Sequence, residues 1–250
     1  MSVNSMKKIR NYWDRKAHIY AELRMRKDWF QKIDQHVLNL IDSELCSKIL
    51  DIGIGPGGFA IKLAKTNDTM VVGIDVSKRS LRIAKTHIKE GKLSGKIFLV
   101  AASADFLPLR EASFDAVASI FTIHHLPPPR RNKSFKEFYR VLKHQGKLAL
   151  VEDWASNPRT IFQHTIYELR KMLMHSEIEE YHAKYYEYVS MLEKNGLKIF
   201  AVEFRPKQVD LSRFESLSSI KARKLLKRAE KLEERQKVVD TTFIGAIKLD

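Results

Sequence analysis

Cysteine is almost absent from this sequence, since Cys46 is the only one among 250 residues. A single cysteine excludes an internal disulfide, a zinc site built from cysteines and a CxxC redox motif. Long apolar runs are also lacking: the segment around Val117–Ile123 is interrupted by Ser119 and Thr122, and none approaches the roughly 18 residues that span a bilayer. Met1–Arg10 lacks the apolar core of a secretory signal, so we expect a soluble, cytoplasmic protein.

Negative charge is scarce relative to positive charge. Lys and Arg total 45 against 30 for Asp and Glu, which gives a formal net charge of +15. Such an excess favours a polyanionic partner, because Lys and Arg neutralise phosphates; a generally basic surface is the alternative. The hydrophobic fraction of 44% is large enough for a real core and excludes a disordered or low-complexity chain.

Strand-like and helix-like segments alternate from Lys48 to about Phe200. This alternation predicts a parallel sheet covered by helices, with ligands at the carboxyl ends of the strands. The expected strands are Lys48–Ile52, Met70–Asp75, Lys96–Val100, Phe114–Phe121, Lys147–Glu152 and Thr241–Leu249. The expected helices are Phe59–Lys65, Ser77–Glu90 with Ser77 as its N-cap, and Arg130–Lys143.

A glycine-rich turn follows the first expected strand, in Asp51-Ile52-Gly53-Ile54-Gly55-Pro56-Gly57-Gly58. Glycines allow a tight turn and a close approach of backbone N–H groups to a ligand. Asp75 ends the next strand, where its carboxylate can accept hydrogen bonds from a ribose. The glycines also fit the GxGxxG of dinucleotide enzymes, but Asp51 suits a ligand with an ammonium group better than a pyrophosphate.

With these motifs, the chain resembles the class I S-adenosylmethionine-dependent methyltransferases of the type-11 group. The matching blocks are ILDIGIGPGG (49–58), VVGIDVS (71–77), LPLREASFDAVASIFTIHHL (107–126) and FYRVLKHQGKLALVE (138–152). The resemblance implies an α/β fold: a seven-stranded Rossmann-like sheet, mostly parallel with an antiparallel last strand, and helices on both faces. Thr241–Leu249 is the candidate for that last strand.

The resemblance also implies one domain, residues 1–250, built around a cofactor-binding core at 46–153. An N-terminal helical lid covers 1–45. A helical insertion with the sixth strand covers 154–203, a basic helical insertion covers 204–239, and the last strand covers 240–250.

The residues that would bind S-adenosylmethionine follow from the matched blocks. Asp51 and the turn would hold the methionine part, Asp75 the ribose, and Val76 would flank the adenine. Ser103 stands where the group often has Asp, so either its hydroxyl or Asp105 would meet the adenine amino group. The full expected set is Asp51, Gly53, Gly55, Pro56, Gly57, Asp75, Val76, Ser103, Ala104, Asp105 and Phe121.

Candidate catalytic groups follow the fourth and fifth strands. His124 and His125 should border the methyl group, where an imidazole can act as a base; a structural hydrogen-bonding role is the alternative. Glu152, Asp153 and Trp154 are candidates for the acceptor pocket, or for a helix cap and a core indole. We expect no metal ion.

Two chemistries are disfavoured by the sequence. Methylation of a pyrimidine C5 atom requires a positioned thiolate, and Cys46 precedes the first strand. Methyltransferases of exocyclic amines carry an Asn/Asp-Pro-Pro-aromatic signature after the fourth strand, where this chain has Ser119-Ile120-Phe121-Thr122.

RNA, and tRNA in particular, is the acceptor that the sequence favours. SIFTIHHL and Lys184-Tyr185-Tyr186 are similar to segments of the tRNA methyltransferases that esterify a carboxymethyl group on wobble uridine. Tyrosines of 155–195 would stack on an unpaired base. The cations expected to contact phosphates are Arg130, Arg131, Lys224, Lys227, Arg228 and Lys231; a solvated helix over 219–237 is the alternative.

The main alternative acceptor is a small molecule, such as a quinone or lipid precursor. Type-11 enzymes similar to the ubiquinone and menaquinone methyltransferases share the same blocks. The aromatic residues of 1–45 and 155–195 would then form an apolar lid over the acceptor. A non-catalytic binding protein is disfavoured because Asp51, the glycines and Asp75 are all present.

Overall fold

The structure is a computed structural model of the chain. It describes residues 3–26, 28–153, 158, 160–177, 180–209, 211, 219–232 and 238–249. Among these residues, no helix combines the length and the apolar character needed to cross a membrane.

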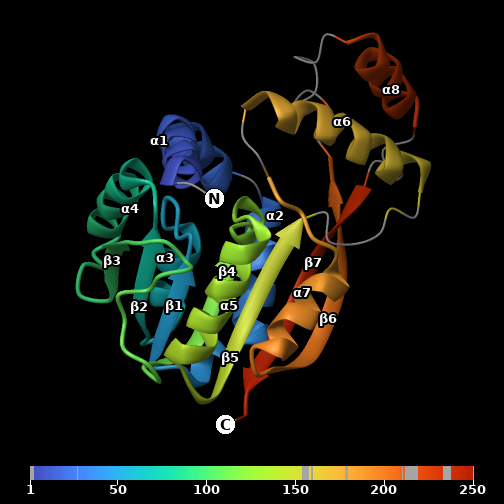
Figure 1. The fold of residues 1–250 in the computed structure, drawn as a ribbon. Helices are drawn as coiled ribbons and strands as arrows, with labels where there is room; N and C mark the ends of the chain where they lie inside the picture. Colours follow the sequence, from blue (N-terminus) through green and yellow to red (C-terminus); the bar gives the residue numbers. More distant parts are fainter. Residues whose placement is uncertain are drawn as a thin grey trace.

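A single seven-stranded sheet forms the centre of the molecule, in the order β3-β2-β1-β4-β5-β7-β6 (Figure 1). Strand β7 runs antiparallel to β5 and β6, whereas the β1–β2, β1–β4, β2–β3 and β4–β5 pairs are parallel. The strands are β1 (Lys48–Ile52), β2 (Met70–Asp75), β3 (Ile97–Ala101), β4 (Phe114–Ile120), β5 (Leu142–Asp153), β6 (Leu197–Gln208) and β7 (Val238–Lys248). The expected seven-stranded, mostly parallel sheet with an antiparallel last strand is therefore confirmed.

Helices cover both faces of the sheet and create two apolar layers. Helices α2 (Asp28–Leu40), α3 (Gly58–Thr66) and α4 (Lys78–Glu90) contribute to the layer that contains Ile49 and Val71. Helices α5 (Pro128–Val141) and α7 (Tyr185–Lys194) contribute to the layer that contains Leu50 and Val72. Neighbouring residues of a strand point to opposite faces of the sheet. Because helices cover both faces here, both sets of side chains are buried, which explains why the strands are nearly continuous apolar runs.

Helix α1 (Val3–Arg26) lies against α4, above the end of the sheet at which β1 and β2 finish (Figure 1). The Oδ1 atom of Asp14 accepts hydrogen bonds from the Ser77 hydroxyl at 2.7 Å and from the Arg79 N–H at 3.1 Å. Ser77 is also the N-cap of α4, as expected, since its Oγ accepts from the Ser80 N–H at 3.0 Å. Asp14 therefore fixes α1 to the N-terminus of α4.

A smaller apolar cluster lies beyond the sheet, where α6 (Ile161–Glu177) packs against α8 (Ile220–Glu230) (Figure 1). Phe162, Ile166 and Leu169 of α6 are buried there with Ala222 and Ala229 of α8. The cationic side chains of α8 are left on the outside.

Some expected boundaries differ from the structure. The helix expected to reach Lys143 ends at Val141, because β5 begins at Leu142 and pairs irregularly with β4 between Phe114 and Ala116. The basic insertion expected at 204–239 is shorter, since β6 continues to Gln208 and β7 begins at Val238.

Candidate functional site

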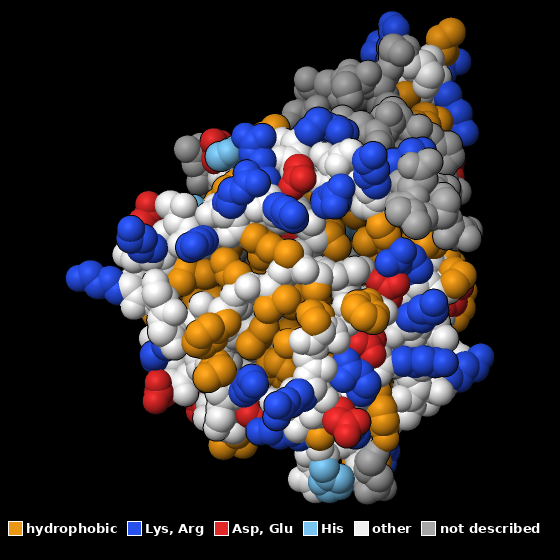
Figure 2. All heavy atoms as spheres, turned by 60° about the vertical axis from the view of Figure 1, so that its left-hand side comes forward, with side chains coloured by type: hydrophobic (Ala, Val, Ile, Leu, Met, Phe, Trp, Pro, Cys, Tyr) orange, Lys and Arg blue, Asp and Glu red, His pale blue; other side chains and the backbone are white. Residues whose placement is uncertain are grey.

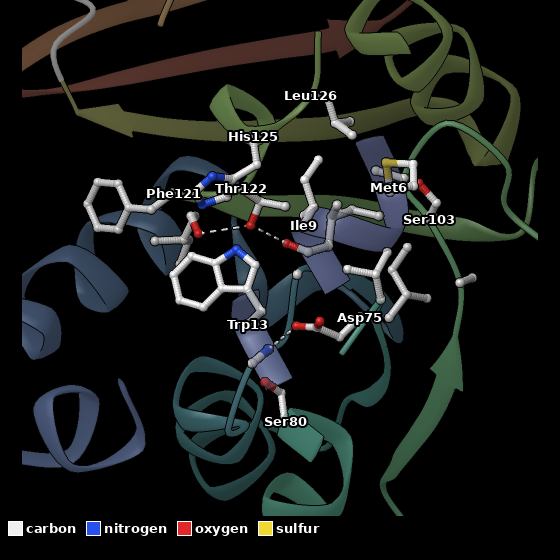
Figure 3. Close-up of a pocket in the computed structure, with 18 of the residues that line it drawn as sticks. Met6, Ile9, Trp13, Asp75, Ser80, Ser103, Phe121, Thr122, His125 and Leu126 are labelled. Carbon is white, nitrogen blue, oxygen red and sulfur yellow. Dashed lines mark hydrogen bonds between the residues drawn. The ribbon is translucent and has the colours of Figure 1, made fainter. Parts of the chain in front are cut away.

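A cavity lies at the carboxyl ends of the central strands, beneath α1 (Figure 3). Gly53, Gly55 and Asp75, at the ends of β1 and β2, border it on one side, and apolar side chains from α1 border it on the other. The expected residues that line it are Gly53, Gly55, Asp75, Val76, Ser103, Ala104, Phe121 and His125.

The turn after β1 is shaped by a close approach to the loop after β4. Gly53 has a φ of +72°, and a Cβ atom there would lie 2.2 Å from Oγ1 of Thr122. Thr122 in turn donates a hydrogen bond to the Ile52 carbonyl at 3.2 Å. Position 53 therefore requires glycine for both its backbone conformation and its space.

Asp75 is held in place by backbone donors on both carboxylate oxygens. Its Oδ2 accepts from the Gly55 N–H at 2.9 Å, and its Oδ1 accepts from the Ser77 N–H at 2.8 Å. Burial raises the pKa of Asp75 to about 6, while the hydrogen bonds from Ser77 and Gly55 act in the opposite direction. A carboxylate accepts more than one bond per oxygen, so the fixed group can still receive ribose hydroxyls.

Asp51 is the acid that fits an ammonium group. It is only 3% exposed, and its Oδ2 atom has no hydrogen-bond partner among the described residues. Burial raises its pKa to about 7, and the Arg24 guanidinium lowers it in part. Buried polar atoms normally have partners, so this oxygen is a candidate acceptor for an ammonium group.

Four expected cofactor residues, Asp51, Pro56, Gly57 and Asp105, are not among the residues that line the cavity. The Pro56 carbonyl contacts the His87 ring at 3.0 Å, and Gly57 is the N-cap of α3. Asp105 accepts hydrogen bonds from the Ser103 hydroxyl at 2.5 Å and from Arg130 at 2.9 Å. Ser103 therefore faces the cavity, whereas Asp105 supports it from behind.

The two expected catalytic histidines separate in the short 3-10 helix η2 (Ile123–His125). His125 lines the cavity, with its ring 5.0 Å from that of Trp13, and its Nδ1 has no hydrogen-bond partner among the described residues. Burial lowers the pKa of His125 well below its usual range. His124 is absent from the cavity wall, and its Nδ1 lies 2.5 Å from Oε2 of Glu152.

The two acids that end β5, Glu152 and Asp153, have structural partners. Glu152 is 1% exposed and accepts from the Ile123 N–H at 2.9 Å, and burial raises its pKa to about 7. Asp153 accepts from the Thr241 hydroxyl at 3.0 Å. Neither is among the residues that line the cavity, and the acceptor-pocket role of both stays a prediction. Trp154 lies outside the described residues.

Phe121 lines the cavity from a strained position. Its φ is 53°, which is rare for a bulky residue and costs about 1–3 kcal/mol. The backbone N–H still bonds to the Val151 carbonyl at 2.9 Å. The ring lies 5.6 Å from Trp29 and 6.4 Å from Phe30 of α2, which hold it at the cavity.

Sequence reasoning missed much of the wall that α1 supplies. Met6, Ile9, Trp13 and Tyr20 all line the cavity. They are spaced by three, four and seven residues, which places them on one face of a helix, and this spacing was the available signal. Two aromatic residues of the expected N-terminal lid, Trp13 and Tyr20, thus line the cavity, whereas no described residue of 155–195 borders it.

Some of the residues expected to bind phosphates or to stack on a base are buried, and others are exposed. Arg131 is 2% exposed, donates to the Leu126 carbonyl and lies over the Tyr188 ring, so the expectation that it contacts phosphate is wrong. Tyr188 is itself buried and cannot stack on a base, whereas Tyr186 is 53% exposed. Arg130 is paired with Asp105. The remaining four cations, Lys224, Lys227, Arg228 and Lys231, are exposed.

Comparisons with known proteins agree with this geometry. Residues 49–146 match a family model described as a methyltransferase domain. The chain is 30% identical over 139 residues to 27-O-demethylrifamycin SV methyltransferase of Amycolatopsis mediterranei, covering 56% of this chain and 48% of that protein. It is 34% identical over 107 residues to ubiquinone/menaquinone biosynthesis C-methyltransferase UbiE of Rhizobium etli, covering 42% and 41%.

Those matches thus span less than half the length of either relative. Among solved structures, a phosphoethanolamine N-methyltransferase of Haemonchus contortus in complex with S-adenosylhomocysteine shares the fold. It has a TM-score of 0.67 at 18% identity, covering 96% of this chain and 60% of that one.

Proposed function

We propose that this chain, in which residues 49–146 form a class I methyltransferase domain with S-adenosylmethionine as its cofactor, methylates a small, largely apolar acceptor. One observation carries the proposal: the cavity that contains Asp75 and the glycine turn is closed by an apolar and aromatic wall from α1. When bound, S-adenosylmethionine supplies the electrophilic methyl group.

On the cofactor side, the chain's residues would bind S-adenosylmethionine and orient it. The Oδ2 atom of Asp51, which has no partner among the described residues, would accept a hydrogen bond from the ammonium group. Asp75, whose two oxygens are held by backbone donors, would accept hydrogen bonds from the ribose hydroxyls. Ser103 and Ala104 line the cavity near Val76 and would meet the adenine. Fixing both reactants in this way removes much of the entropic barrier to an in-line displacement.

On the acceptor side, the wall contains Trp13, Phe121, Leu126 and His125, and none of the described residues that line it is Lys or Arg. The ring of Trp13 packs edge-on against His125, so an acceptor there would lie between apolar surfaces that exclude water. Nδ1 of His125 is the polar atom available to hydrogen-bond an acceptor hydroxyl. The rifamycin and quinone substrates in the relatives' names support an acceptor of this class.

RNA is the second candidate, and surface charge supports it. Figure 2 shows Lys and Arg side chains around a hollow in which apolar side chains gather. The net charge of +15 and the exposed cations of α8 would attract phosphates. The small acceptor is preferred because α1 covers the cavity, so that a base could enter only after leaving its own stack.

The first test uses tritium-labelled S-adenosylmethionine with a lipid extract and with total tRNA from the source cells. We expect label in a small molecule of the lipid extract and none in tRNA. His125→Asn should lower the rate while leaving the affinity for S-adenosylhomocysteine unchanged. Label in tRNA alone would reject the small acceptor, and an unchanged rate in His125→Asn would remove His125 from the acceptor side.

The cofactor roles are tested separately by calorimetry with S-adenosylhomocysteine. Asp75→Asn replaces a charged acceptor, and a hydrogen bond to a charged group contributes about 1.5–3 kcal/mol, so affinity should fall at least tenfold. Asp68→Asn is the matched control, since the Asp68 side chain is 99% exposed. Equal affinity in the two variants would reject the ribose role of Asp75.

A further inference from the structure

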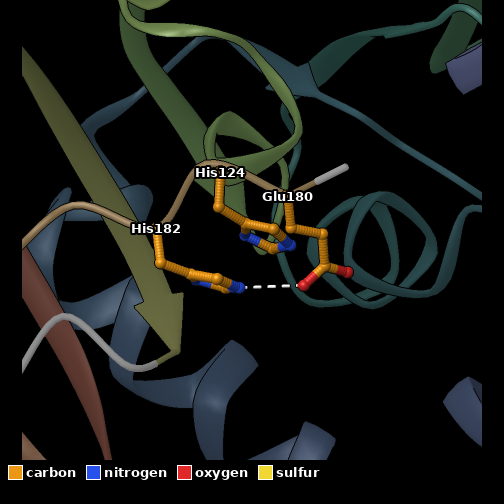
Figure 4. A group of neighbouring side chains, drawn as sticks. All are labelled: His124, Glu180 and His182. Carbon is orange, nitrogen blue, oxygen red and sulfur yellow. Dashed lines mark hydrogen bonds and ion pairs between the residues drawn. The ribbon is translucent and has the colours of Figure 1, made fainter. Parts of the chain in front are cut away.

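A second cluster of chemically active side chains lies outside the cavity wall. It consists of His124 from η2 and of Glu180 and His182 from the segment that precedes α7. One ligand atom from each residue lies within 4.8 Å of the others, and the side chains point toward one another (Figure 4). The two imidazole rings are nearly parallel, with centroids 4.7 Å apart.

We propose that His124, Glu180 and His182 bind a divalent transition-metal ion of the Zn²⁺ type. Imidazole nitrogen suits Zn²⁺, Cu²⁺, Fe²⁺ and Ni²⁺, whereas Mg²⁺ and Ca²⁺ prefer sites made of oxygen. Two histidines and one glutamate form a set of three protein ligands, which leaves a further coordination position for water or another ligand. The inference goes beyond the proposed methyl transfer and does not depend on it.

The orientation of His124 supports this assignment. Its Nδ1 lies 2.5 Å from Oε2 of Glu152, and Oε1 of Glu152 is held by the Ile123 N–H at 2.9 Å. The Nδ1 atom of His124 therefore has a carboxylate partner. In metal sites, a carboxylate on the ring nitrogen that does not bind the ion fixes the tautomer and the ring orientation of the histidine.

The segment that supplies the other two ligands is anchored independently of any ion. The Tyr181 N–H donates to the His124 carbonyl at 2.6 Å, and Arg131 donates to the carbonyls of Tyr181 and Leu126. Glu180 and His182 are therefore held against η2 by the backbone between them. Such preorganisation reduces the entropy lost on binding an ion.

Burial also favours an ion at this place. The side chains of His124, Glu180 and His182 are 5%, 13% and 11% exposed, so water competes little for their ligand atoms. Glu180 and His182 lie 2.8 Å apart and can form an ion pair of their own. That pair is the metal-free explanation of the cluster, and the experiment has to separate the two.

A bound ion would act next to the cavity. The rings of His124 and His125 lie 4.1 Å apart, and His125 lines the cavity. The ion would tie η2 to the segment before α7 and so restrain the backbone that carries His125.

The experiment uses the full chain, stripped of metal with a chelator and titrated with Zn²⁺ by calorimetry. We expect one tight site per chain, no comparable binding of Mg²⁺, and a rise in melting temperature with excess Zn²⁺. Co²⁺ in place of Zn²⁺ should give visible absorption bands that report nitrogen and oxygen ligands.

Variants locate the site. Glu180→Gln and His182→Gln should each weaken Zn²⁺ binding at least tenfold and change the Co²⁺ spectrum. His18→Gln is the matched control, since His18 is an exposed histidine of α1, and it should bind as wild type does. Affinity for S-adenosylhomocysteine, measured on the same samples, shows that each variant is folded and separates this proposal from the one on methyl transfer.

The proposal is overturned if the folded wild-type chain binds no Zn²⁺, in which case the Glu180–His182 ion pair explains the cluster. It is equally overturned if Glu180→Gln and His182→Gln bind Zn²⁺ as tightly as His18→Gln does. The ion would then sit on other histidines of the surface.

Discussion

Asp51 places a carboxyl group in a buried position where no described residue bonds to its Oδ2. Burial raises its pKa from 3.8 to about 7. Because the folded chain holds this proton up to about pH 7 and the unfolded chain loses it near pH 4, the stability of the ligand-free protein falls as pH rises across that window. The charged form of Asp51 thus costs stability in the ligand-free protein.

The first prediction concerns Asp51→Asn, which removes the charge and keeps the shape. Without cofactor at pH 8, its free energy of unfolding should exceed that of wild type by about 1–3 kcal/mol, and the gain should vanish near pH 4. Affinity for S-adenosylhomocysteine should fall at least tenfold, because the ammonium loses its charged acceptor.

Thermal unfolding at the two pH values and calorimetry measure these effects, with Asp68→Asn as the exposed control. A variant that is no more stable than wild type at pH 8 would contradict the stated cost of the charge. Unchanged affinity would remove Asp51 from the binding of the amino group.

Neighbouring residues can have different roles that the sequence does not distinguish. His124 and His125 are adjacent, yet the 3-10 turn directs one toward Glu152 and the other toward the cavity. Arg131 looks like part of a basic helix face, but α5 turns it toward Tyr181 and Tyr188. Which way such a side chain points depends on the packing of distant elements.

At the scale of elements, the central strands were the most predictable part. β1 and β2 have the expected bounds, Lys48–Ile52 and Met70–Asp75, because short apolar runs end at glycine or an acid there. The glycine turn and Asp75 were found for the same reason. The wall supplied by Met6 and Ile9 of α1 was not found, since the sequence does not say where a flanking helix docks.

The second prediction concerns the attachment of α1. Asp14→Ala removes the acceptor of the Ser77 hydroxyl and the Arg79 N–H, a contact similar to a helix cap and worth about 1 kcal/mol. If that energy holds α1 over the cavity, affinity for S-adenosylhomocysteine should fall about fivefold. Amide hydrogen exchange in α1 should become faster.

Arg15→Ala is the matched control for that prediction, because Arg15 is the next residue of α1 and is exposed. Calorimetry should give wild-type affinity for Arg15→Ala. Equal affinity and equal exchange in Asp14→Ala would show that α1 stays in place without this contact.

At the scale of the whole molecule, charge and cavity lie in different places. Acids near the sheet pair with bases, as in Asp105–Arg130, Asp115–Lys143 and Glu137–Arg140. The four exposed cations lie on α8 and at its C-terminus, and the apolar residues of α8 pack against α6 beyond the sheet (Figure 1). No described residue of α8 borders the cavity, so these charges can serve an RNA without serving the chemistry.

The third prediction separates the two acceptor classes through those charges. In a variant with Lys224, Lys227, Arg228 and Lys231 all changed to Gln, cofactor affinity should be unchanged, because none of them touches the cavity. With a small acceptor, the rate of methyl transfer should also be unchanged from low to moderate salt. If tRNA is the acceptor, wild-type binding should weaken steeply with salt, and the variant should lose about 3 units of the slope of log K against log salt.

Filter binding of labelled tRNA from 50 to about 200 mM salt, with transfer rates under the same conditions, distinguishes the cases. A rate that falls together with tRNA affinity in the variant would reject the small acceptor and assign α8 to the substrate. Loss of tRNA affinity with an unchanged rate would mean that tRNA binding at α8 is separate from methyl transfer, because the cavity would then work without the basic helix.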